Sequence, residues 1–399
     1  MISESVVNSL KKASWIRAMF EEGEKLRKIH GADNVYDFTL GNPDHEPPSS
    51  VKETLKKIVT EDKPGIHRYM NNAGYEDVRQ KVADYLNRTS GLSSISSQHI
   101  IMTCGAAGAL NVVLKTLLNP GEEVIILAPY FAEYIFYVGN HGGKVVIVPP
   151  EKDSFKPDLK ILENSITEKT KAIIINSPNN PSGYIYSEET LKEIFEVLEK
   201  KEKEYNSSIY AISDEPYYKL VYDNVKLPFL FRLYKKSFIV NSFSKSLALA
   251  GERIGYIAVN PEIPELELIL ESLIFCNRTL GYVNAPALFQ KAIADSLDAD
   301  IDVESYKQRR DLIYDTLTRL GFSCIKPQGT FYIFPKSPIE DDIQFIKHAV
   351  KYNILLVPGT GFGLPGHFRL SYCVSMDTIK KSLPAFEALA KDFNLIKKT

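Results

Sequence analysis

The chain has 399 residues, of which 44% are hydrophobic and 25% charged, and its formal net charge is -2. This composition is typical of a folded globular protein, and the length favours two domains. The near balance of charge excludes the basic field expected of a nucleic-acid-binding protein and the polybasic anchor expected at an anionic membrane.

The cysteines and the N-terminus indicate the compartment. Cys104, Cys276, Cys324 and Cys373 lie too far apart to suggest a zinc site or a redox pair, and a large core needs no disulfide. The seven histidines show no metal-ligand spacing, so we expect no metal. The N-terminus lacks a secretory apolar stretch, and the longest apolar runs have the length of a strand. We therefore predict a cytoplasmic protein with reduced thiols.

Through the middle of the chain, short β-branched runs alternate with longer helical patterns. The predicted strands are His99–Thr103, Glu123–Ala128, Lys144–Val148, Lys171–Asn176, Ile209–Ser213, Ser237–Asn241 and Ile254–Val259. The clearest predicted helices between them are Ala106–Leu118 and Glu188–Lys203. This alternation predicts an α/β fold, with a mostly parallel seven-stranded sheet between helices. The run Lys171–Asn176 is apolar throughout, as expected for a strand buried on both faces.

After about Ala285 the pattern changes to longer amphipathic helices with few strands. The predicted helices are Ala285–Ser296, Ser305–Leu320, Asp341–Tyr352 and Asp377–Asp392, and the strands are Phe331–Phe334, Ile354–Val357 and Phe368–Ser371. We predict a large domain over residues 46–285 and a smaller α/β domain built from both termini, residues 1–45 and 286–399.

Polar residues follow four of the predicted strands. Gly105-Ala106-Ala107-Gly108 follows the first, Asn179-Asn180-Pro181-Ser182-Gly183 comes shortly after the fourth, Asp214-Glu215-Pro216-Tyr217 follows the fifth, and Ser242-Phe243-Ser244-Lys245 follows the sixth, with Arg253 eight residues later. In a doubly wound sheet, ligands bind beyond the carboxyl ends of the strands. A glycine turn, an amide, a carboxylate with a phenol and an amine with hydroxyls therefore converge on one edge.

Each of these groups suits a phosphorylated pyridine aldehyde. Backbone N–H groups at the start of a helix bind phosphate, and Arg253, Ser242 and Ser244 complete such a pocket. Asp214 beside the ring nitrogen would keep that nitrogen protonated. Asn180 and Tyr217 would bond the ring oxygen. Lys245 would form a Schiff base with the aldehyde and act as a base once a substrate amine replaces it.

These motifs, in this order, resemble the class I/II aminotransferases of the aspartate aminotransferase superfamily (fold type I), which use pyridoxal 5'-phosphate. The resemblance runs from Gly41-Asn42-Pro43 to Phe368-Arg369-Leu370-Ser371. It implies transfer of an amino group from an amino acid to a 2-oxo acid by a ping-pong mechanism. It also implies a homodimer in which Tyr69 reaches the phosphate of the neighbouring subunit. Phe131 would stack on the cofactor ring, Arg369 would bind the substrate α-carboxylate, and the Gly41 backbone would close over that carboxylate.

Two departures from the family pattern concern phosphate binding and substrate specificity. Many relatives carry a hydroxyl at the phosphate turn, whereas Gly105-Ala106-Ala107 offers only backbone donors. Ala107 also stands where an aspartate-specific subgroup carries a lysine for the distal carboxylate of the substrate. Arg278 is only a loose analogue of the arginine that serves the same purpose in other relatives, so the amino donor and acceptor stay open.

Other interpretations are weighed against this one. Ser242-x-x-Lys245 fits the serine motif of penicillin-recognising enzymes, but the partner motifs of that family are absent. The glycines of 359–363 resemble a nucleotide loop without a P-loop lysine, and we predict a turn there. A C–S lyase or decarboxylating enzyme of the same fold would use the same residues. A non-catalytic aminotransferase-like binding domain is a third possibility.

Overall fold

The computed structural model describes residues 2–12 and 14–396, so residues 1, 13 and 397–399 of the predicted domains lie outside the described residues. The helices are α1 (Glu4–Lys12), α2 (Ser14–His30), α3 (Ser49–Glu61), α4 (Glu76–Ser90), α5 (Gly105–Leu117), α6 (Tyr134–Asn140), α7 (Leu159–Ser165), α8 (Glu188–Tyr205), α9 (Phe243–Ser246), α10 (Leu266–Thr279), α11 (Ala287–Ala294), α12 (Val303–Arg319), α13 (Asp342–Ala349) and α14 (Met376–Asp392). The strands are β1 (Tyr36–Asp37), β2 (Ile100–Thr103), β3 (Glu123–Leu127), β4 (Lys144–Val148), β5 (Thr170–Asn176), β6 (Tyr210–Asp214), β7 (Ser237–Ser242), β8 (Gly255–Val259), β9 (Tyr332–Ile333), β10 (Ile354–Leu355), β11 (Val357–Pro358) and β12 (Phe368–Ser371).

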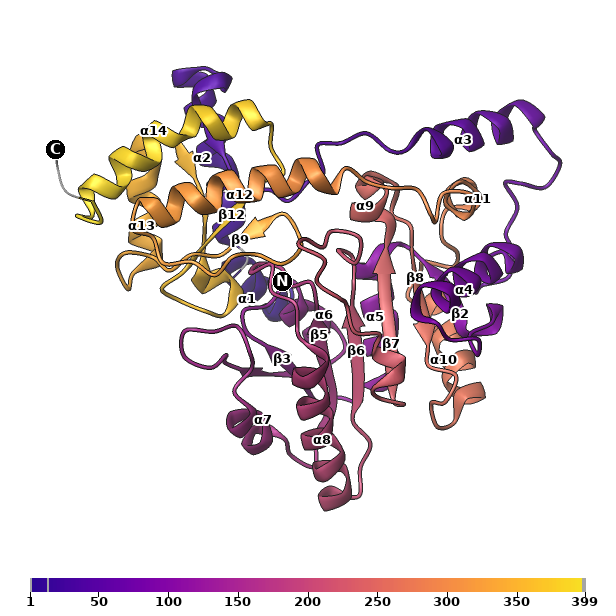
Figure 1. The fold of residues 1–399 in the computed structure, drawn as a ribbon. Coiled ribbons are helices and arrows are strands. Elements are labelled where there is room, and N and C mark those ends of the chain that lie inside the picture. The colour runs from indigo at the N-terminus through magenta and orange to yellow at the C-terminus, as the bar shows by residue number, and fades with distance from the viewer. Residues whose placement is uncertain (1, 13, 397–399) are drawn as a thin grey trace.

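The predicted seven-stranded sheet is confirmed, with the strand order β2-β8-β7-β6-β5-β3-β4. Neighbouring strands are parallel except where β8 pairs antiparallel with both β7 and β2. Because β8 alone is reversed, the other six strands run in the same direction and end at one edge of the sheet. Figure 1 shows this edge facing the second unit of the molecule, which contains β9 and β12.

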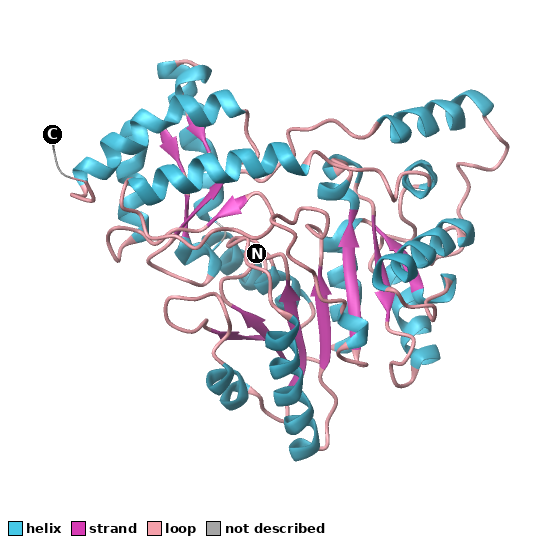
Figure 2. Ribbon diagram, viewed as in Figure 1, coloured by secondary structure: helices cyan, strands magenta, loops and turns pink. Residues whose placement is uncertain are grey.

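Helices cover both faces of this sheet, as Figure 2 shows. Successive side chains of a strand point to opposite faces, so Ile173 and Ile175 of β5 pack with α4, α7 and α8, whereas Ile174 packs with α5, α6 and α10. All three isoleucines are buried. A strand that is covered on both sides has no polar face, which explains its unbroken apolar sequence.

The second unit combines both termini, as the sequence predicts. Strand β1 pairs parallel with β10, and a second sheet has the antiparallel order β11-β12-β9. Phe38 from the N-terminal segment is fully buried in the same cluster as side chains of α12, α13 and α14. The chain therefore begins in this unit, builds the large sheet, and returns. No helix among the described residues is both long and apolar enough to cross a membrane.

The boundaries of some elements differ from the prediction. The predicted strand Ile354–Val357 is two short strands, because the chain leaves β1 and joins β12 after Leu356. Asp214 is the last residue of β6 rather than the residue after it. The division into residues 1–45, 46–285 and 286–399 stays a prediction. Within it, Ala292 and Ile293 of α11 pack in the cluster of the large sheet.

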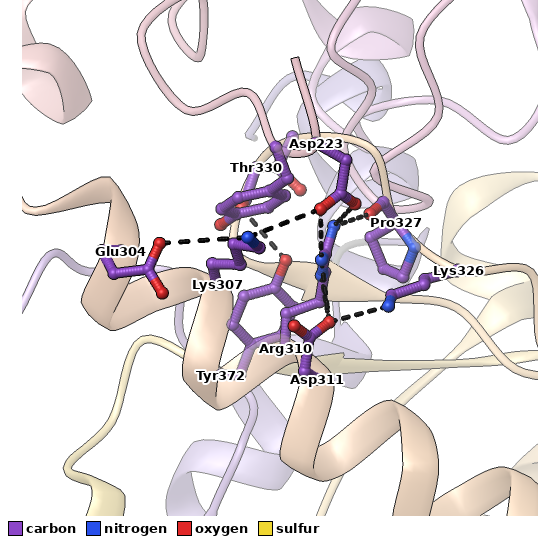
Figure 3. Close-up of polar contacts among 10 residues, drawn as sticks. Asp223, Glu304, Lys307, Arg310, Asp311, Lys326, Pro327, Thr330 and Tyr372 are labelled. Carbon is purple, nitrogen blue, oxygen red and sulfur yellow. Dashed lines mark hydrogen bonds and ion pairs between the residues drawn. The ribbon is translucent and has the colours of Figure 1, made fainter. Parts of the chain in front are cut away.

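A fully buried arginine joins the two units (Figure 3). The Arg310 guanidinium of α12 donates to both oxygens of Asp223, at 2.6 and 3.2 Å, and to the carbonyl oxygen of Pro327 at 3.0 Å. It also bonds Asp311 at 2.7 Å and lies over the Tyr222 ring at 4.6 Å. Asp223 lies in the segment between β6 and β7 of the large sheet, so this arginine ties that segment to α12.

Replacing Arg310 should destabilise the fold. Arg310→Ala removes several charge-assisted hydrogen bonds and leaves a space beside Tyr222, so the free energy of unfolding should fall by about 3 kcal/mol. Lys307→Ala is the matched control, because Lys307 is part-exposed and lies 3.8 Å from Asp223; its cost should stay below about 1 kcal/mol. Urea denaturation of the two variants would measure the difference, and equal losses would contradict the role given to Arg310.

Candidate active site

A cavity of about 240 Å³ lies at the carboxyl edge of the large sheet. Ten of the predicted site residues line it, and they come from α5, β6, β7, α9 and the loops after β3, β5, β6 and α9. These are Ala106, Ala107, Phe131, Asn180, Asp214, Tyr217, Ser242, Ser244, Lys245 and Arg253. The convergence expected from the strand order is therefore present in the structure.

Lys245 lies on the one-turn helix α9, directly after the buried strand β7. Its Nζ donates to the carbonyl oxygen of Gly41 at 2.6 Å and lies 5.6 Å from the centre of the Phe331 ring. Burial lowers the pKa of Lys245 to about 8, the Cys373 sulfur opposes that shift, and the Arg369 cation adds to it. A substantial fraction of this amine is thus neutral near pH 8.

Asp214 is buried at the end of β6. Its Oδ2 accepts a hydrogen bond from Tyr134 at 2.5 Å, whereas its Oδ1 is buried without a partner among the described residues. Burial raises the pKa of Asp214 to about 7, although the Tyr134 hydrogen bond acts in the opposite direction. An unsatisfied buried carboxylate oxygen is unfavourable, and it marks a place where a ligand with an N–H donor would fit.

Arg369 of β12 is hydrogen-bonded both to the loop after β5 and to the N-terminal segment. Its Nη1 donates to Asn180 Oδ1 at 3.0 Å and its Nη2 to the carbonyl oxygen of Thr39 at 2.6 Å. The guanidinium lies between the rings of Tyr332, at 4.5 Å, and Phe362, at 4.7 Å. Two aromatic faces hold the charged plane in one orientation. Its Nε is buried without a partner among the described residues.

Only glycine fits at position 41 without a shift of the neighbouring side chain. A Cβ built there would lie 1.6 Å from the hydroxyl oxygen of Tyr332, so any side chain would displace that ring. The Tyr332 hydroxyl in turn accepts a hydrogen bond from Tyr217 at 3.4 Å. Gly41 therefore lets the N-terminal segment approach closely enough for its carbonyl to reach Lys245.

The glycine turn and Arg253 form the other end of the cavity. Gly105 opens α5 with φ +72°, a conformation that favours glycine, and a Cβ there would lie 3.0 Å from the Arg253 guanidinium. Arg253 donates to the carbonyl oxygen of Ala250 at 2.9 Å. Ser242 and Ser244 are both buried at the start of α9. Backbone N–H groups, a cation and two hydroxyls thus surround one end of the cavity, as an anion requires.

Two predicted residues lie apart from the cavity. The Tyr69 side chain is 89% exposed, and Arg278 is an exposed residue of α10 whose guanidinium packs over Phe275. Sequence reasoning also missed several residues of the site. Tyr134, Tyr137, Tyr332 and Cys373 contact the site or line it, and no motif marks them because packing between distant segments brings them there.

Comparison with known proteins identifies the family. Residues 33–386 match the sequence family described as aminotransferase class I and II. The chain belongs to this family. Among curated aminotransferases, the probable aspartate aminotransferase of Methanocaldococcus jannaschii is 35% identical over 86% of this chain and 90% of that protein. The aspartate/prephenate aminotransferase of Thermus thermophilus is 33% identical over 91% of this chain and 92% of that protein.

Solved aminotransferase structures share the whole fold. An amino transferase from Eubacterium rectale superposes with a TM-score of 0.95 at 42% identity, covering 99% of this chain and 100% of that one. Aspartate aminotransferase from Thermus thermophilus, with maleate, gives a TM-score of 0.85 at 29% identity, covering 98% and 100%. The predicted family and fold class are confirmed, and the chain is an aminotransferase by these comparisons.

The lowered pKa of Lys245 predicts how its free amine reacts with pH. Below about pH 8 the amine is protonated and unreactive, so acetylation of Lys245 in the cofactor-free chain should reach half its maximal rate near pH 8. An ordinary exposed lysine titrates near ~10.4. Mass spectrometry of the modified peptides, with exposed Lys56 as internal reference, would measure both rates. A half-maximum near pH 10 for Lys245 would show that burial does not shift its pKa.

Proposed function

We propose that this aminotransferase moves an amino group from an amino acid to a 2-oxo acid in two half-reactions, with pyridoxal phosphate carried on Lys245. The observation that carries the proposal is the cavity that holds both the largely buried Lys245 and the buried Asp214, whose Oδ1 lacks a partner among the described residues. The protonated ring nitrogen of this cofactor would supply the missing donor. The residues present therefore fit the cofactor that the family uses.

The cavity residues divide between the two ends of the cofactor. Its phosphate would be bound by the backbone of Gly105, Ala106 and Ala107 and by Ser242, Ser244 and Arg253, at the N-terminus of α5. Asn180 and Tyr217 would bond its ring oxygen, and Phe131 would pack against the ring. When bound, the cofactor supplies an electron-withdrawing ring that makes the α-hydrogen of an attached amino acid acidic.

Lys245 is the base that takes this proton. Its Nζ is neutral in part at physiological pH because burial lowers its pKa to about 8, and a neutral amine with such a pKa is an efficient proton acceptor. The carbonyl oxygen of Gly41 accepts a hydrogen bond from the same nitrogen and fixes its position. Lys245 would accept the proton from the substrate α-carbon and pass it to C4′ of the cofactor, and in the second half-reaction it would carry out the reverse transfer, from C4′ to the α-carbon of the 2-oxo acid.

Arg369 would bind the α-carboxylate of the substrate. Tyr332 and Phe362 hold its guanidinium from both faces, and Asn180 fixes Nη1. A planar guanidinium suits bidentate binding of a carboxylate, and the free Nε offers a further donor. The backbone of Gly41 would close over the same carboxylate. This binding orients the α-carbon toward Lys245 and favours reactions that keep the carboxylate, which a decarboxylating enzyme would lose.

Two parts of the proposal concern the surroundings of the enzyme. Tyr69 is exposed in one subunit, and in a homodimer it would reach the phosphate of the neighbouring active site. The cytoplasmic location also stays a prediction.

Relatives are named for aspartate, prephenate, aromatic amino acids and N-acetyl-LL-diaminopimelate, so dicarboxylic and aromatic amino acids are the first donors to test.

A spectrophotometric screen tests the half-reaction. Adding the preferred amino acid to the holoenzyme, without any oxo acid, should convert the absorption of the lysine-bound cofactor to that of the aminated cofactor and release one 2-oxo acid per site. Adding a 2-oxo acid should reverse the change. No spectral change with any common amino acid would refute transamination, and catalytic release of pyruvate and ammonia without an acceptor would instead support the C–S lyase.

Substitution of the two buried ionisable residues separates their roles. Lys245→Ala should lower turnover by at least about 10²–10⁴-fold, because the proton acceptor is lost. Asp214→Asn keeps the shape but no longer offers the ring nitrogen a charged partner, so turnover should fall by at least about 10²-fold. Lys56→Ala, an exposed lysine of α3, is the control and should retain wild-type turnover. Steady-state kinetics would measure all three, and near-normal activity of Lys245→Ala would overturn the assignment.

A further inference from the structure

The glycine turn at the phosphate end of the cavity has no side-chain hydrogen-bond donor. The turn that begins α5 is Gly105-Ala106-Ala107, and the two alanine methyl groups line the cavity. No side chain of this turn can therefore donate a hydrogen bond. A phosphate dianion with three terminal oxygens accepts many hydrogen bonds, so a donor from another element would strengthen binding at this end. Such a donor matters only if the cavity binds the proposed cofactor.

Helix α6 lies alongside α5, and two hydrogen bonds fix the position of one helix along the axis of the other. His141, at the end of α6, bonds Asn111 Oδ1 at 3.1 Å, and Asn111 Nδ2 donates to the carbonyl oxygen of Ala107 at 2.9 Å. Both helices begin at the carboxyl edge of the sheet after parallel strands, so they run in the same direction. Residues four apart on a helix share a face. One turn before the His141–Asn111 contact, Tyr137 is therefore level with Ala107.

The hydroxyl of Tyr137 is available to a ligand. Tyr137 lines the same cavity as Ala107 and Arg253. Its hydroxyl makes no hydrogen bond with any other described residue, whereas Tyr134, three residues earlier on α6, is already bonded to Asp214. Burial raises the pKa of Tyr137, and Glu133 and Asp214 raise it further, so the phenol keeps its proton at physiological pH. It is thus a donor, as a phosphate requires.

We propose that Tyr137 is a further ligand of the cofactor, whose phenol O–H donates a hydrogen bond to the phosphate at the turn that lacks a side-chain hydroxyl. The phenol would enter from α6, level with the turn of α5, in the same cavity to which Arg253 contributes the cation. This arrangement moves a donor from the turn itself to the neighbouring helix. It assigns Tyr137 to binding of the phosphate and gives it no part in proton transfer.

Equilibrium dialysis of the full-length, cofactor-free chain against two ligands tests this contact. Pyridoxal phosphate and pyridoxal differ only in the phosphate. Tyr137→Phe keeps the ring and removes the hydroxyl, so it should weaken binding of pyridoxal phosphate by roughly 10- to 100-fold, as expected for a lost charge-assisted hydrogen bond. Binding of pyridoxal should change by less than about twofold, since no phosphate is present. Tyr205→Phe, on α8 away from the cavity, is the control and should match the wild type with both ligands.

The possible outcomes separate this inference from the proposed function. If the wild-type chain fails to bind pyridoxal phosphate, both are refuted. If the wild type binds it and Tyr137→Phe binds it equally well, Tyr137 is not a ligand and only this inference fails. Equal weakening for both ligands would place the contact away from the phosphate and would also overturn the inference. Circular dichroism of the variant would show that the fold is intact.

Discussion

The site depends on keeping an amine and a carboxylate buried in one cavity without neutralising each other. Burial lowers the pKa of Lys245 to about 8 and raises that of Asp214 to about 7, because neither group has a full counter-charge. The stability cost of Asp214 therefore grows as pH rises from the ordinary carboxylate pKa of about 3.9 to 7, and that of Lys245 falls as pH rises from 8 to the ordinary lysine pKa of about 10.4. Between these values both penalties are present. The packing of the large sheet against its helices must offset the loss of folding free energy that these two groups cause.

The substrate end of the site is made where the two units meet. Lys245 of the large sheet bonds Gly41 of the N-terminal segment, and Arg369 of β12 bonds both Asn180 and Thr39. Neither unit alone brings these groups together. The buried Arg310 network holds the same two units together farther from the cavity, so the geometry around Lys245 depends on interactions that no residue of the site makes.

Most of the fold and much of the site could be predicted from local sequence. Unbroken apolar strands such as β5 identify a sheet covered on both faces, and the residues after each strand gather at one edge because the strands are parallel. The missed residues come from packing between segments. Tyr134 reaches Asp214 from 80 residues away, and Tyr332 of β9 contacts both Arg369 of β12 and Tyr217. No local pattern records such pairs.

The pairing of β1 with β10 has a consequence for synthesis of the chain. Tyr36 emerges from the ribosome early, yet its partner Ile354 follows on the order of 300 residues later. At typical elongation rates of about 5–20 residues per second, the N-terminal segment waits roughly 15 to 60 s for its partner strand. The large sheet is complete at Val259, well before then. Vectorial folding would therefore build the middle of the molecule first, and Phe38 would find its buried position only after the second unit has been synthesised.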